Sequence, residues 1–176
     1  MGMYHRLRVL HRWIGLIGSL FLVLISATGF LLATKSTFGW VRPPESKGTP
    51  LQSLSDLVAV DLAANAAFAL GIKELKTYKD IDRIDYRPKS NVFKIVSKEG
   101  YQEVQVDGST GEVLQVGFRL DQMAENIHDL SYFSATLRTY WLPVVAVLLF
   151  LLGVTGIFLF FVPVVRRWRY RHSQRA

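Results

Sequence analysis

Two long runs of uncharged, mostly apolar residues constrain this chain more than any other feature. The first covers 13–34 and the second 139–165, and neither contains Asp, Glu, Lys, Arg or His. Each run is longer than the ~20 residues that cross a bilayer as a helix. A cleaved signal peptide is the alternative for the first run, but its apolar core is only ~7–15 residues long. The runs therefore predict a membrane protein with two transmembrane helices.

The charged residues predict how these helices are oriented. All 14 acidic residues and 13 of the 21 basic residues lie between 35 and 138, so the net charge of +7 comes from the two tails, 1–12 and 166–176. By the positive-inside rule, both termini are cytoplasmic and the segment between the helices is exported. Because topology explains the basic residues, we do not expect nucleic-acid binding. The absence of cysteine excludes disulfides and thiolate metal sites.

The exported segment has the pattern of one small α+β domain. A linker with Pro and Gly, 35–50, is followed by apolar residues at helical spacing over 51–70, and Gly71 is the expected stop. The apolar period then changes to two in four short runs separated by turn residues, at 81–86, 91–98, 101–107 and 112–118. Residues 51–119 are therefore predicted to form an antiparallel β-meander with one helix packed on it.

Two further patterns concern the membrane. Residues 120–138 carry an apolar stripe opposite acidic residues, which predicts an amphipathic helix at the outer membrane face leading into the second span. Small residues recur as Gly15 and Gly18 in the first span and as Gly153 and Gly156 in the second. Such residues let helix backbones approach closely in lipid, so we expect an interface, either within one chain or between chains.

Few residues offer chemistry. No nucleotide-binding loop, His-Glu-x-x-His or Gly-x-Ser-x-Gly motif is present in the sequence, so no nucleotide cofactor is predicted and catalytic residues are not identified. His5 and His172 lie in the basic tails and are expected to be solvated. His11 and His128 remain, each near one end of a span. A histidine at a membrane end is often only an interfacial polar residue, and this alternative stays open.

Neutral imidazole is also a good axial ligand for haem iron, which makes His11 and His128 candidate ligands of haem b and of no other metal. A span of 22 residues rises ~33 Å, so one chain does not easily bring the two histidines together. A twofold dimer would instead pair each histidine with its symmetry mate. Arg12 would then face the propionates of an inner haem, and Lys35 or Arg138 those of an outer one.

A family resemblance covers nearly the whole chain. The sequences LHRWIGL at 10–16 and ISATGFLL at 25–32 resemble the first helix of the PepSY-associated transmembrane helix family. VDGSTGEVL at 106–114 resembles part of a PepSY domain. IHDL at 127–130, followed by GVTGIFL at 153–159, resembles the second helix of that family. No single motif is highly specific, but their order is.

The resemblance implies a haem-carrying redox protein of the bacterial inner membrane that reduces ferric iron or a ferric siderophore, with ligands at His11 and His128. Larger members have four or more spans in one chain, so this chain would act as a homodimer or with a larger membrane partner. The family also implies an alternative, a non-enzymatic membrane-anchored protein that binds or regulates a peptidase or another envelope protein. A third possibility is an accessory subunit of an uptake system.

Overall fold

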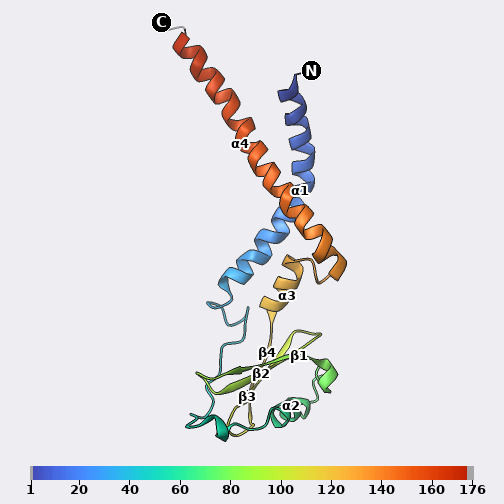
Figure 1. Cartoon of the computed structure of the whole chain (residues 1–176), viewed down its shortest axis with the longest axis vertical. Helices are drawn as coiled ribbons and strands as arrows, with labels where there is room; N and C mark the ends of the chain where they lie inside the picture. Colours follow the sequence, from blue (N-terminus) through green and yellow to red (C-terminus); the bar gives the residue numbers. More distant parts are fainter. Residues whose placement is uncertain (1, 174–176) are drawn as a thin grey trace. The chain divides into compact units, whose positions relative to one another are not determined.

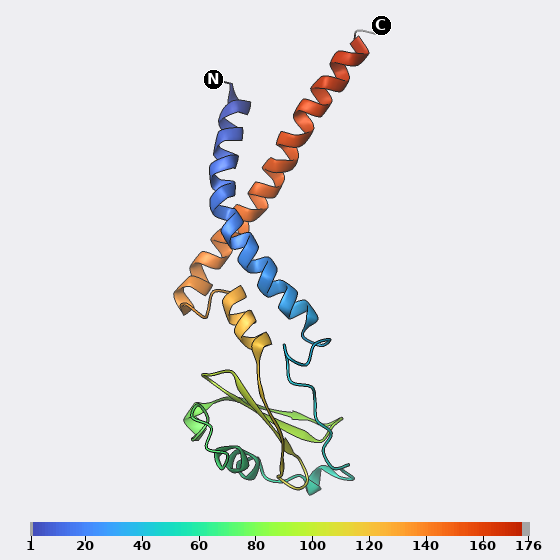
Figure 2. The same cartoon turned by 180° about the vertical axis from the view of Figure 1, so that it is seen from behind.

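The computed structural model describes residues 2–173 and divides into two compact units. The helical unit comprises Met1–Gly29 and Asn126–Ala176, and the sheet unit comprises Phe30–Glu125. Figures 1 and 2 show the order of the elements along the chain. Arg175, which the sequence assigns to the second basic tail, lies outside the described residues.

Two long helices dominate the helical unit: α1, Met3–Thr34, and α4, Leu142–Ser173. Both are long and apolar enough to cross a bilayer, which confirms the two predicted apolar helices. Many of their large apolar side chains point outward, and Leu20 and Phe150 are 72% and 69% exposed. Lipid chains are as apolar as these side chains, so such exposure suits a membrane environment. The helix α1 also includes most of the first basic tail.

The helices α1 and α4 pack against each other through glycine. A Cβ atom on Gly18 would lie 2.7 Å from the Cδ1 atom of Leu152 and 3.6 Å from the Cδ2 atom of Leu149, and one on Gly15 would lie 3.9 Å from Leu152. The two helices cross in both views (Figures 1 and 2). The Gly15 and Gly18 interface therefore lies within one chain, whereas a Cβ atom on Gly153 would have no described neighbour within 4 Å.

The helix before the second span is shorter than the sequence predicts. Helix α3 covers Leu120–His128 and does not continue to 138. The chain turns directly after it, where Leu130 has a φ of 64° and the Ser131 N–H donates to the Asp129 carboxylate over 2.9 Å. An Asp side chain that bonds the backbone two residues on stabilises a turn in competition with the helix. The sequence did not predict this break, because the apolar residues keep their helical spacing through Leu130.

The chain re-enters a helix through the π-helical turn η3, Leu137–Trp141, which continues into α4. Pro143 explains the wider turn. In a regular α-helix its ring would collide with the carbonyl group of Thr139, and it has no N–H to donate. The π-helical turn directly before the proline adds a residue to the turn, so the proline ring no longer faces that carbonyl group at α-helical spacing.

The sheet unit contains a four-stranded antiparallel sheet with the order β1-β2-β3-β4, which confirms the predicted meander. Its strands are β1, Ile81–Arg87; β2, Val92–Ser97; β3, Gln102–Asp107; and β4, Val113–Phe118. The connections contain residues with positive φ, namely Asn91 at 49°, Gly100 at 73°, Tyr101 at 51° and Gly111 at 75°. Tight hairpins require this conformation, which Gly and Asn tolerate best.

One face of the sheet packs against helix α2, Val60–Phe68, to form the core. The helix buries its alanines, and the strands contribute Phe93, Ile95, Val104 and Val106. Ala63, Ala64 and Ala67 have no exposed surface. Small side chains let the helix axis lie close to the sheet, so the alanines form its buried face.

The apolar residues that suggested one helix over 51–70 do not all lie on a helix or in the core. Ser53 caps a short 3₁₀ turn, η1, Leu54–Asp56, and the helix proper begins only at Val60. Leu54 and Leu62 are 69% and 48% exposed. The spacing of large apolar residues therefore predicted too long a helix and did not identify the alanines as its buried face.

The segment 35–50 covers the opposite face of the sheet and is more than a tether. Val41 is fully buried, and the Ser46 N–H donates to the Gln105 side chain over 2.7 Å. Thr49 donates to the Asp107 carboxylate through both its N–H and its hydroxyl group, over 2.7 and 2.8 Å. As a result, β2 and β3 are buried on both faces.

Candidate functional site

The first candidate site joins His11 on α1 to Thr155 on α4. The His11 Nδ1 atom lies 2.8 Å from the Thr155 Oγ1 atom. That hydroxyl group also lies 2.8 Å from the carbonyl of Leu151, to which it can donate its one proton while its oxygen accepts from the ring. In the tautomer with the proton on Nδ1, both hydrogen bonds form and the Nε2 lone pair of His11 is left for a ligand or metal.

The second candidate site has the same His–Thr contact, but here α1 contributes the threonine and another helix contributes the histidine. The His128 Nδ1 atom, at the end of α3, lies 2.9 Å from the Thr28 Oγ1 atom on α1. Thr28 donates to the carbonyl of Leu24 over 2.7 Å and is itself buried. Here too, the tautomer with the proton on Nδ1 allows both hydrogen bonds and leaves the Nε2 lone pair of His128 for a ligand.

A glycine follows the threonine in both sites. A Cβ atom on Gly156 would lie 3.4 Å from the Cε1 atom of His11, and one on Gly29 would lie 3.7 Å from the Cε1 atom of His128. Each imidazole ring thus rests on a Thr-Gly pair of another helix. The sequence pattern singled out Gly156 for helix packing, but it did not connect either glycine with a histidine.

The two sites are well separated. His11 and the residue that holds His128, Thr28, lie seventeen positions apart on α1, which corresponds to about 25 Å along a helix axis. No single haem can therefore bind both histidines of one chain. Among residues 2–173, no cluster of three or more His, Cys, Asp or Glu side chains could hold a metal ion on its own.

An apolar groove of about 190 Å³ adjoins His11 between α1 and α4. Its lining consists of leucine and isoleucine side chains from both helices, together with Thr155: Leu7, Leu10, Ile14, Leu148, Leu151 and Leu152. Sites for whole small molecules usually enclose roughly 300–1,000 Å³. The groove fits one edge of a large apolar ring system and is too small to enclose it.

The proposed propionate partners occupy other interactions. The guanidinium group of Arg12 lies 5.8 Å from the ring centroid of its neighbour Trp13. Arg138 forms an ion pair at 3.0 Å with Asp129, the residue directly after His128. The Arg138 side chain is 62% exposed. Exposed ion pairs contribute little stability, so Arg138 can change partners at low cost.

The sheet unit holds a charge network that the sequence interpretation missed. On the face opposite α2, Arg119 makes a two-pronged ion pair with Asp121 at 2.7 and 2.8 Å and a second pair with Glu103 at 2.7 Å. Lys94 lies 4.0 Å from Glu103 and 3.2 Å from Glu45. Strict alternation along β2 and β3 puts Lys94 and Glu103 on one face, and this signal was present in the sequence.

The network shifts the protonation of its members. Burial raises the pKa of Asp121, but the hydrogen bonds and positive charge of Arg119 outweigh it and hold that pKa below its ordinary value. Burial lowers the pKa of Arg119, and its two carboxylate partners more than compensate, so the pKa is raised. Asp121 and Arg119 are therefore both charged at neutral pH, which matches a structural ion pair.

Comparison with known protein families gives a match that spans both long helices and the sheet. No curated protein and no solved structure matches this chain significantly. The model of one family, described as the PepSY-associated TM region, matches residues 8–176 and so covers both long helices and the sheet unit between them. The chain is therefore a membrane protein that belongs to the PepSY-associated TM region family.

Proposed function

We propose that this protein binds haem b in the bacterial inner membrane and passes electrons outward to ferric iron or a ferric siderophore. The observation that carries the proposal is the contact of each histidine Nδ1 atom with a threonine hydroxyl group, Thr155 for His11 and Thr28 for His128. When Nδ1 donates to the threonine, the Nε2 lone pair is available for iron. Metal-binding histidines generally donate their other ring N–H to a fixed acceptor in this way.

A bound haem b would supply one-electron redox chemistry at each site. The chain itself orients the ligands, because each imidazole is held between its threonine and the adjacent glycine. The apolar side chains around His11 exclude water and suit an apolar ring. Arg12 and Arg138 carry positive charge next to His11 and in the segment after His128, where they would balance propionates.

The proposal includes a homodimer. Each site offers a single imidazole, and the two sites of one chain are about 25 Å apart along α1. A second copy related by a twofold axis would supply the matching histidine and complete the groove beside His11. Both termini would be cytoplasmic, as the basic tails predict.

The deciding experiment is optical spectroscopy of full-length protein purified from haem-replete cells. We expect a haem spectrum that changes on reduction, and a dimer by light scattering. His11→Ala and His128→Ala should each remove about half of the haem, because each ligates a different centre. His172→Ala is the matched control, since the contact of His172 among residues 2–173 is with Trp168 of its own helix. Colourless wild-type protein, or full haem content in both variants, would contradict the proposal.

The acceptor is tested separately. After anaerobic reduction and removal of the reductant, adding a ferric chelate should reoxidise the wild-type haem. The His128→Ala variant should lose fast reoxidation, because the outer centre would deliver electrons to the exported side. Haem that is present but is not reoxidised would reject ferric iron as the acceptor without rejecting haem binding.

One observation favours the second candidate function, an anchored protein that binds an envelope partner. Strand β4 is an edge of the sheet, and its Leu114, Val116 and Phe118 side chains are 36–45% exposed. Exposed edge strands readily pair with another chain. Under this alternative, Val116→Arg should abolish co-purification of a peptidase, whereas Gln52→Arg and both histidine variants should retain it.

A further inference from the structure

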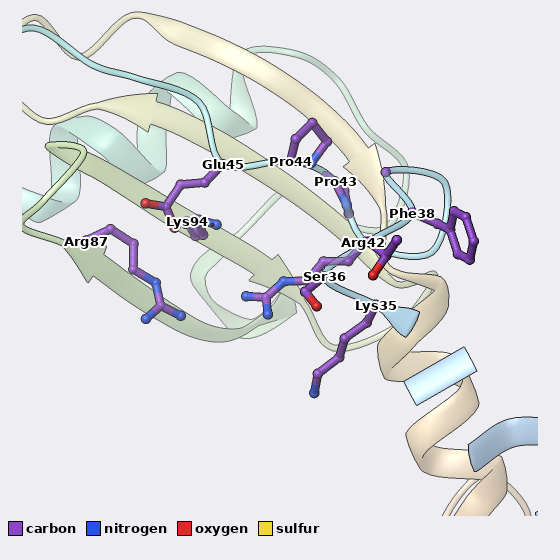
Figure 3. A pocket seen from close by; sticks show the side chains of 11 residues that line it. Lys35, Ser36, Phe38, Arg42, Pro43, Pro44, Glu45, Arg87 and Lys94 are labelled. Carbon is purple, nitrogen blue, oxygen red and sulfur yellow. Dashed lines mark ion pairs between the residues drawn. The ribbon is translucent and has the colours of Figure 1, made fainter. Parts of the chain in front are cut away.

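The sheet unit has a cleft that the proposed redox chemistry does not use. It has a volume of about 450 Å³ and lies between the segment after α1 and the face of the sheet opposite α2. Figure 3 shows the side chains that line it. The antiparallel register pairs Asp85 with Lys94 and Arg87 with Val92, so Arg87 shares the face that carries Lys94.

The lining of the cleft is strongly basic. It contains the side chains of Lys35, Arg42, Arg87 and Lys94, and Glu45 is the only carboxylate that the described residues contribute to it. In Figure 3 the charged ends of Lys35, Arg42 and Arg87 lie on one side of the sheet and Glu45 lies beside Lys94.

The one carboxylate is already engaged. Glu45 accepts a hydrogen bond from the Ser90 hydroxyl group over 2.6 Å and pairs with Lys94 at 3.2 Å. The Ser90 bond, followed by Lys94, holds the pKa of Glu45 below its ordinary value. Glu45 thus neutralises Lys94 and leaves the other three cations uncompensated from within the cleft.

The nearest acids outside the cleft compensate Arg42 and Arg87 only in part, because each acid also pairs with another arginine. Asp121 lies 3.9 Å from Arg42, but Arg119 already holds both of its oxygens. Asp85 lies 4.0 Å from Arg87 and 3.3 Å from Arg83, which also pairs with Asp82 at 2.8 Å. The side chains that line the cleft therefore carry a net positive charge, which the acids beside it offset only in part.

Arg87 provides the most specific sign of a missing partner. Its Nε atom is shielded from solvent and has no hydrogen-bond acceptor among residues 2–173. A buried donor without an acceptor costs free energy, and folded proteins rarely leave one in that state. A guanidinium group binds an oxyanion through two parallel N–H donors, and Nε–H is commonly one of them.

We propose that this cleft binds a phosphate-bearing anion, with Arg87 as its two-pronged anchor and Lys35 and Arg42 as further charge partners. Several cations on separate segments suit a group with more than one negative charge. The volume admits a small phosphate ester. Lys35 directly follows the last residue of α1, so a phospholipid headgroup is one source of the phosphate, and a free phosphorylated molecule is the other.

The first arm of the test measures binding of inorganic pyrophosphate by calorimetry to the full chain in phosphatidylcholine nanodiscs, in phosphate-free buffer at low salt. Arg87→Gln should weaken binding about ten- to a hundredfold, because it removes a charged two-pronged contact. Lys35→Gln should weaken it about two- to fivefold, because Lys35 is partly exposed. Lys73→Gln is the matched control, since it makes the same charge change on an exposed residue outside the cleft.

The second arm distinguishes the two sources. Native mass spectrometry after addition of phosphatidylglycerol should retain one bound lipid that is lost in Arg87→Gln and Lys35→Gln, if a headgroup occupies the cleft. If both variants retain the same lipids as wild type while pyrophosphate binding is weakened, the ligand is a free phosphate compound. No pyrophosphate binding at millimolar concentration and no lipid loss, or equal effects of Lys73→Gln, would overturn the proposal.

Discussion

In the helical unit, His11 and His128 each meet one hydroxyl group across a helix contact, within helices whose large apolar side chains are largely exposed. In the sheet unit, by contrast, charged side chains connect from Lys94 through Glu103 and Arg119 to Asp121 on a buried face. Isolated polar pairs suit lipid, where few polar partners are available. A network suits a domain in water, because buried charges need several partners each.

The largest expected effect tests the network. Arg119→Met should reduce the free energy of unfolding of the sheet unit by about 3–5 kcal/mol, because it leaves Glu103 and Asp121 buried without their main partner. Hydrogen exchange of the β2 and β3 amides in the full chain measures the change. Arg83→Met is the matched control, since its ion pairs are exposed, and it should cost less than about 1 kcal/mol. Equal losses of unfolding free energy in both variants would mean that the buried network stabilises the sheet unit no more than an exposed ion pair does.

The next effect tests the helix contact. Gly18→Val should destabilise the helical unit by about 1–3 kcal/mol, because its first side-chain atom would collide with Leu152. Thermal unfolding in detergent measures it. Gly153→Val changes the same intrinsic helix preference in a place with no neighbour within 4 Å, so it isolates the packing effect. Similar melting temperatures for the two variants would contradict a glycine-dependent interface within one chain.

A smaller effect concerns pH. The pKa of Asp121 is below its ordinary value of about 3.9 in the folded state, so its ionised form stabilises the fold above that pH. As pH falls through the folded pKa, the carboxyl group becomes protonated and this stabilisation is lost. We expect the free energy of unfolding of the sheet unit to decline below pH ~4. Asp121→Asn should be less stable at neutral pH and should decline less steeply; parallel pH profiles would disprove the assignment.

The smallest effect concerns the single polar pairs. Thr155→Val and Thr28→Val should each cost about 0.6 kcal/mol, the average for a hydrogen bond between membrane helices. Thr34→Val is the control, because Thr34 bonds only its own helix backbone. If haem is bound, the two threonine variants should also shift the reduction potential of one centre each, which a merely structural hydroxyl group would not do. An unchanged potential would show that the threonines do not tune the ligands.

The sequence predictions were accurate where the interactions are between residues close in the sequence, and less accurate where they depend on tertiary packing. The strands were located closely, because alternation and turn residues such as Gly100 and Gly111 act over a few positions. The helix over 51–70 was extended too far, because the burial of Ala63 and Ala67 depends on how closely the sheet lies against them. The break after His128 was missed, because a local bond from Asp129 competes with the helical pattern.

The sequence alone determined the class of this protein. Length and apolarity require two spans, alternation requires a sheet, and the positions of His11 and His128 suggest where chemistry could occur. Only the tertiary structure showed that the Nδ1 atom of each histidine meets a hydroxyl group, because Thr155 lies 144 positions from His11 and Thr28 lies 100 positions from His128, and helix packing brings them together. It also decided which cations share a cleft, since register and a covering segment bring Lys35 and Arg87 together.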